Sequence, residues 1–106
     1  MTNTTTFKGR AAELRWGYAC AGTLGSWTMT ADPTGLRVTA EVLAIDAYRA
    51  AQQPLTFCVI RQTTVWQWPV VSLHIAGSTL TATLSPQEDR DGGLVHQAGD
   101  RTTAPV

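Results

Sequence analysis

Apolar and polar residues alternate through most of the central part of the chain, a period of two that is typical of half-buried β-strands. The clearest stretch runs from Val71 to Leu84 and contains Gly77-Ser78, which predicts a two-residue hairpin turn. With this turn the apolar residues of the two strands share one face, as the pairs Ile75 with Leu80, Leu73 with Ala82 and Val71 with Leu84. The opposite face carries Ser72, His74, Thr81 and Thr83.

Two further hairpins follow from the same alternation. Asp32-Pro33-Thr34-Gly35 has the residues of a type I turn, and residues 61–64 separate two more apolar strands. In the first of these hairpins the predicted pairs are Ala31 with Leu36, Met29 with Val38 and Trp27 with Ala40. In the second they are Val59 with Trp66, Phe57 with Trp68 and Leu55 with Val70.

The face that carries apolar residues changes at Pro69. Before this proline the even-numbered positions are apolar, and after it the odd-numbered positions are. A bulge or a strand that bends between two parts of a sheet produces such a change, and proline within a strand favours the same place. Residues 68–71 are therefore predicted to form the corner of a barrel.

The remaining segments give less regular signals. Residues 12–20 alternate as a strand, and we expect residues 22–25 to supply the turn after it. From Val42 the alternation fails, so we expect the strand to end near residue 45 and a short helical segment to occupy residues 46–53. The alternative is a longer helix over residues 40–52, which also has an apolar stripe.

Together these elements predict an all-β domain of about six antiparallel strands in three hairpins, closed into a small barrel or sandwich. The longer helix would make the fold α+β. We expect residues 1–10 to form a flexible N-terminal arm, residues 11–86 to form the single β domain, and residues 87–106 to form a polar C-terminal tail. A domain this small needs several of its large aromatic side chains in the core.

Charge and hydropathy narrow the choice of partners. The 106 residues carry a formal net charge of zero with a single lysine, so no basic stripe indicates a nucleic acid. No apolar run reaches membrane-spanning length and no signal peptide is recognisable. We expect a soluble protein made in the bacterial cytoplasm, with a protein as its partner and no contact with a membrane.

Residues for catalysis or metal binding do not form a known pattern. Cys20 and Cys58 lie on separate predicted strands and form no C-x-x-C pair, so we expect free thiols, with a disulfide between them as the alternative. Together with His74 and His96 they have unrelated spacings, so we expect no metal and no cofactor. Nucleophile elbows, P-loops and dinucleotide-binding motifs do not occur in the sequence. We therefore expect a protein that is not an enzyme.

Partner contacts are expected on outward side chains. Trp16 and Tyr18 form an aromatic pair that becomes a contact patch if it lies on an open face. Arg37 and Glu41 point away from the second hairpin, and His74 points away from the last. These five residues are the predicted partner contacts.

Pro54-Leu55-Thr56-Phe57, Trp66-Gln67-Trp68-Pro69 and the last hairpin resemble small single-domain β proteins of tailed phages. That resemblance implies a virion component, incorporated into the particle as a homo-oligomer or with other subunits, or an inhibitor that binds a host defence protein. A third hypothesis is a β-barrel that binds a small molecule or a single-stranded nucleic acid through aromatic residues at its mouth.

Overall fold

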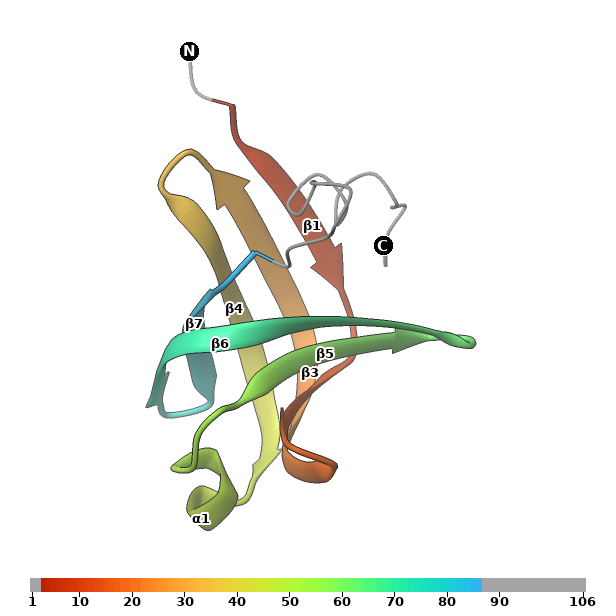
Figure 1. Cartoon of the computed structure of the whole chain (residues 1–106), viewed down its shortest axis with the longest axis vertical. Coiled ribbons are helices and arrows are strands. Elements are labelled where there is room, and N and C mark those ends of the chain that lie inside the picture. The colour runs from red at the N-terminus through yellow and green to blue at the C-terminus, as the bar shows by residue number, and fades with distance from the viewer. Residues whose placement is uncertain (1–2, 87–106) are drawn as a thin grey trace.

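A computed structural model describes residues 3–86 of the chain (Figure 1). Seven strands and one helical turn follow one another along it. They are β1 (Thr5–Gly9), β2 (Ala12–Trp16), β3 (Ala19–Asp32), β4 (Gly35–Ile45), α1 (Ala47–Ala50), β5 (Thr56–Arg61), β6 (Thr64–Ala76) and β7 (Thr79–Leu84). No helix among residues 3–86 is long and apolar enough to cross a membrane.

Six of the strands close into an antiparallel barrel. Their order is β3-β2-β5-β6-β7-β4, and β4 pairs with β3 to complete the circle. β1 is an additional strand that pairs with the second half of β3. It lies along the same edge of β3 as β2, which pairs with the first half. The all-β prediction is confirmed. The α+β alternative is wrong, because β4 continues to Ile45 and α1 is a single turn inside the predicted segment 46–53.

The three predicted hairpins have the predicted registers over most of their length. The structure pairs Ala31 with Leu36 and Met29 with Val38 in β3–β4, and Phe57 with Trp68 in β5–β6. In β6–β7, Ile75 pairs with Leu80. These pairs are determined by residues close in sequence, because a short turn and a single buried face leave one register.

One pair of the last hairpin is shifted by a β-bulge. The prediction that Val71 faces Leu84 is wrong, since Val70 pairs with Leu84 and Ser72 with Thr83. Val71 is the extra residue of the bulge and is 63% exposed. The bulge lies at the predicted barrel corner, where β6 leaves β5 and begins to pair with β7.

The turn expected at residues 22–25 is wrong. The chain reverses at Gly17 and Tyr18, and β3 runs without a break through Gly22 and Gly25. Gly17 has a φ of 63°, which suits a tight turn. Gly22 and Gly25 instead allow close packing, because a methyl group there would lie 2.7 Å from Ile45 Cδ1 and 2.5 Å from Glu41 Oε1.

The N-terminal arm also differs from the prediction. Residues 5–9 were expected to belong to a flexible arm, yet they form β1, with Phe7 packed against the core. The contact is close, since a methyl group at Gly9 would lie 2.4 Å from Trp27 Cζ2. The predicted tail, residues 87–106, and His96 within it lie outside the described residues.

Aromatic side chains fill the inside of the barrel. Phe57 lies between Trp27 and Trp68, with ring centroids 5.8 Å and 6.0 Å away. All three are almost fully buried, and Trp27 Nε1 donates a hydrogen bond to the Ala11 carbonyl oxygen at 3.1 Å. Side chains therefore occupy the interior of the barrel.

Candidate interaction surfaces

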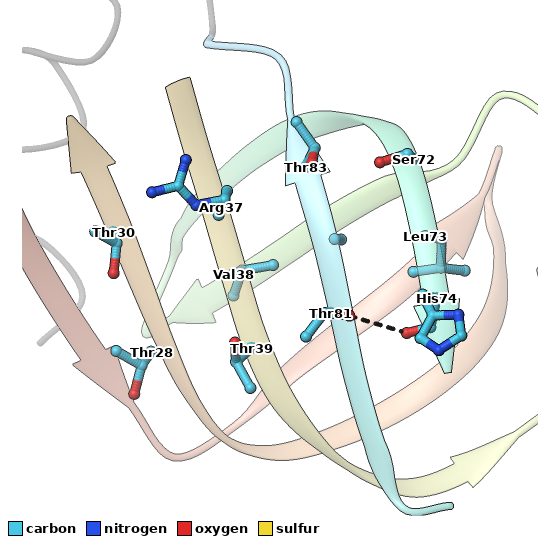
Figure 2. Close-up of a pocket in the computed structure, with 11 residues that line it drawn as sticks. Thr28, Thr30, Arg37, Val38, Thr39, Ser72, Leu73, His74, Thr81 and Thr83 are labelled. Carbon is cyan, nitrogen blue, oxygen red and sulfur yellow. Dashed lines mark hydrogen bonds between the residues drawn. The ribbon is translucent and has the colours of Figure 1, made fainter. Parts of the chain in front are cut away.

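Two rows of polar side chains cross the outside of the barrel over β3, β4, β7 and β6 (Figure 2). We call this surface the threonine face. Strand pairing aligns the first row as Thr28, Thr39, Thr81 and His74, and the second row as Thr30, Arg37, Thr83 and Ser72. Paired residues on one face lie about 5 Å apart, so the hydroxyl groups form a regular array.

The threonine face contains a shallow cavity of about 400 Å³. Both Arg37 and His74 line it, so the structure brings these two predicted contact residues to one place. The hydroxyl of Thr81 donates a hydrogen bond to the main-chain oxygen of His74 at 3.4 Å, as Figure 2 shows. His74 itself is exposed.

Arg37 is held by the turn between β3 and β4. Its Nη2 lies 2.7 Å from Asp32 Oδ2, and its Nη1 donates to the Thr34 hydroxyl at 2.9 Å. The Thr34 hydroxyl, Arg37 and the Thr34 N–H all hydrogen-bond the Asp32 carboxylate and lower its pKa from 3.8 to about 2. The guanidinium group is therefore positioned at the rim of the cavity with its charge partly balanced.

A second surface is apolar and lies over β2, β3, β5 and the end of β4. Leu43 is 60% exposed and Ile60 is 46% exposed. Both line a groove of about 250 Å³ whose lining also includes Thr23, Glu13 and Cys58. Ile45 is not part of this groove and lines a separate hollow with Cys20 and Gly22. We call Leu43 and Ile60 the apolar strip.

Aromatic residues gather at the end of the barrel that carries α1. Tyr18 is fully exposed at the tip of the β2–β3 turn, and Tyr48 of α1 is 70% exposed. The ring of Tyr48 meets half-buried Trp16 edge to face, with centroids 6.5 Å apart. Figure 1 shows α1 and the β2–β3 turn at the same end of the molecule. Tyr48 thus extends the aromatic surface of Trp16, while Tyr18 projects from the β2–β3 turn. We call Trp16, Tyr18 and Tyr48 the aromatic end.

Glu41 lies between the two surfaces. The outward residues of β4 are, in order, Arg37, Thr39, Glu41 and Leu43, so one strand runs from the threonine face to the apolar strip. Of the five predicted contacts, Arg37 and His74 line one cavity and Trp16 and Tyr18 belong to the aromatic end. Glu41 belongs to neither group and lies on β4 between the threonine face and the apolar strip.

Leu43, Tyr48 and Ile60 were not among the predicted contacts. The signal for Ile60 was an apolar residue at an outward position of an alternating strand, a position that is usually polar. Leu43 was obscured by the run Val42–Ile45, in which no alternation remains to assign a face.

The two cysteines are free thiols, as expected, and have different surroundings. Cys20 is exposed, whereas Cys58 is buried at the base of the apolar groove. Burial raises the pKa of Cys58 to about 11, so the thiol stays protonated at neutral pH and is a poor nucleophile. Among residues 3–86, no three Cys, His or carboxylate side chains lie close enough together to hold a metal ion.

The fold and these surfaces define a class, a small closed antiparallel β-barrel whose outside carries the threonine face, the apolar strip and the aromatic end. Comparison of the chain with protein-family models, with curated proteins and with solved structures found no match.

Proposed function

We propose that this protein is a non-enzymatic structural or interaction subunit of a protein assembly, such as a tailed-phage particle. The observation that carries the proposal is the exposure of large apolar side chains along the apolar strip and the aromatic end. Tyr18, Leu43 and Tyr48 are 101%, 60% and 70% exposed. Large apolar side chains that gather on one part of a surface mark sites of protein contact, because covering them removes apolar area from water.

The form of this surface favours a macromolecular partner. The apolar strip is open and lies outside the barrel, whereas small-molecule pockets enclose most of their ligand. Trp27, Phe57 and Trp68 occupy the space that a ligand would need inside the barrel. Tyrosine and tryptophan at the aromatic end are also the residues most enriched in protein interfaces.

The apolar strip supports a role in protein interaction. The suggestion that the assembly is a phage particle rests on the resemblance to tailed-phage β proteins. An inhibitor of a host defence protein would use the same surface. The structural subunit and the inhibitor differ in oligomeric state. A structural subunit associates with copies of itself or with other subunits, whereas an inhibitor is a monomer or dimer of fixed size.

Sedimentation velocity of the full chain over a wide concentration range tests the proposal. We expect species larger than a dimer at high concentration, and we expect Leu43→Glu and Tyr48→Ser to remove them. Val71→Glu is the matched control, because Val71 is 63% exposed and lies on the bulge of β6, outside the apolar strip and the aromatic end. Assembly that is absent from the wild type, or that survives both substitutions, would refute self-assembly through these surfaces, and the inhibitor would then be the better-supported role.

A further inference from the structure

β1 is an edge strand of the described structure. It stands at the end of the strand order and pairs on one side with β3, and no other strand among residues 3–86 pairs with its second side. Thr5, Thr6 and Lys8 are exposed. An edge strand of this kind presents backbone N–H and C=O groups that can pair with another chain.

We infer that β1 pairs with β1 of a second copy of this chain, antiparallel and centred on Phe7. This inference adds a first dimeric step to the proposed assembly and uses a surface separate from the apolar strip. A two-fold axis at Phe7 would set Phe7 against Phe7 of the second copy, Thr6 against Lys8, and Thr5 against Gly9.

The charge on β1 favours this register over its neighbours. Lysine on an edge strand normally opposes pairing, and an antiparallel pair centred on Lys8 would set two ammonium groups face to face. Centring on Phe7 instead places each Lys8 beside a threonine hydroxyl. It also pairs all five residues of β1, whereas a shifted axis pairs fewer of them.

The threonine face supplies a second argument. Lys8 pairs with Thr28 and Thr6 pairs with Thr30, so β1 extends both polar rows by one residue. In the proposed dimer the row that ends at Lys8 in one copy meets the row that ends at Thr6 in the other. The two threonine faces thereby join into one polar surface, while Phe7, which packs against the core of each copy, meets its equivalent on the inner side.

Five paired residues on each side form a small interface, well below the standard size for a stable complex. We therefore expect a dimer that dissociates on dilution. Because the interface is small, a single cross-strand contact should change the dissociation constant measurably. The two-fold symmetry repeats each substituted contact, so every substitution changes two contacts in the dimer.

Charge substitutions at Thr6 test the register. Sedimentation equilibrium of the full chain should give a monomer–dimer equilibrium whose dissociation constant rises about tenfold for Thr6→Lys, which faces Lys8, and falls severalfold for Thr6→Glu. The double variant Thr6→Lys/Lys8→Glu sets opposite charges against each other and should bring the constant below the wild-type value, as Thr6→Glu does, which it could not do if Thr6→Lys had damaged the fold. Thr39→Lys, at the middle of the same face, is the control and should leave the constant unchanged.

A full chain that remains monomeric at every concentration would overturn the inference. So would a shift of the constant in the same direction for Thr6→Lys and Thr6→Glu, because the edge would then pair in another register or not at all. Leu43→Glu separates the two proposals. If it removes the larger species while the Thr6 variants change nothing, the assembly role stands and the β1 dimer falls.

Discussion

Trp68 is one of the largest side chains in the core, and replacing it by alanine should remove about 4 kcal/mol of the free energy of unfolding. It is 2% exposed, and its ring centroid lies 6.0 Å from that of Phe57. The loss combines the transfer free energy of the indole group, the cavity left behind and an aromatic contact worth about 1 kcal/mol. A domain of this size has a total stability of about 5–10 kcal/mol, so the variant should fold but only marginally.

Urea unfolding followed by far-ultraviolet circular dichroism measures this change. With an m-value near about 1.5 kcal/mol/M, the midpoint should fall by about 2.5 M. Trp66→Ala is the matched control, because Trp66 lies on the same strand but is only partly buried, and it should lose less than Trp68→Ala. His74→Ala, on the exposed face, should change stability by less than about 0.5 kcal/mol. A Trp68→Ala loss equal to that of Trp66→Ala would refute the assignment of Trp68 to the centre of the core.

Three further predictions concern single groups. Gly9→Ala should destabilise the protein by about 2 kcal/mol in urea unfolding, because its methyl group would lie 2.4 Å from Trp27 Cζ2, and wild-type stability would contradict the packing of β1. Ellman's reagent should label Cys20 alone in the folded protein at neutral pH and both cysteines in urea, since Cys58 is buried with its pKa raised to about 11; fast labelling of both would refute this. The folded-state pKa of Asp32 lies below its ordinary value of 3.8, so its contribution is present above pH 3.8 and is lost as the pH falls through about 2. Thermal melts between these pH values should therefore show a smaller decline for Asp32→Asn than for the wild type, and equal declines would count against the Asp32–Arg37 contact.

Local pattern was sufficient to predict the hairpins, and the reason is physical. In β3–β4 and β5–β6 the turn and the paired residues lie close in sequence, so alternation alone aligns Met29 with Val38 and Phe57 with Trp68. The sequence predicted where the bulge at Val71 lies, but not the strand pairing beyond it. An extra residue in one strand shifts every pair on one side of the bulge.

The wrong turn prediction concerned glycine, a residue that occurs both in turns and at places where a side chain packs closely over a strand. Gly22 and Gly25 have the composition of a turn, yet they lie in a strand because the side chains of Ile45 and Glu41 cross over them. Those side chains come from a strand that follows in the sequence, so the purpose of the glycines depends on contacts that local pattern does not contain. The sequence pattern did not predict β1 for the same reason, since its pairing with β3 joins residues 18 to 26 positions apart.

The candidate site shows most clearly what a sequence pattern leaves undetermined. Alternation predicted that Arg37 points outward from one hairpin and His74 from another, and both predictions are right. That they line one cavity depends on β4 pairing with β7, a contact between the two hairpins in which Thr39 faces Thr81. The same pairing leaves the end of β4 free of β7, and Leu43 lies in that part of the strand. The pairing of β4 with β7 thus creates the threonine face and leaves the apolar strip open. The sequence pattern could therefore predict which way single residues such as Arg37 and His74 point, but not which of them share a surface.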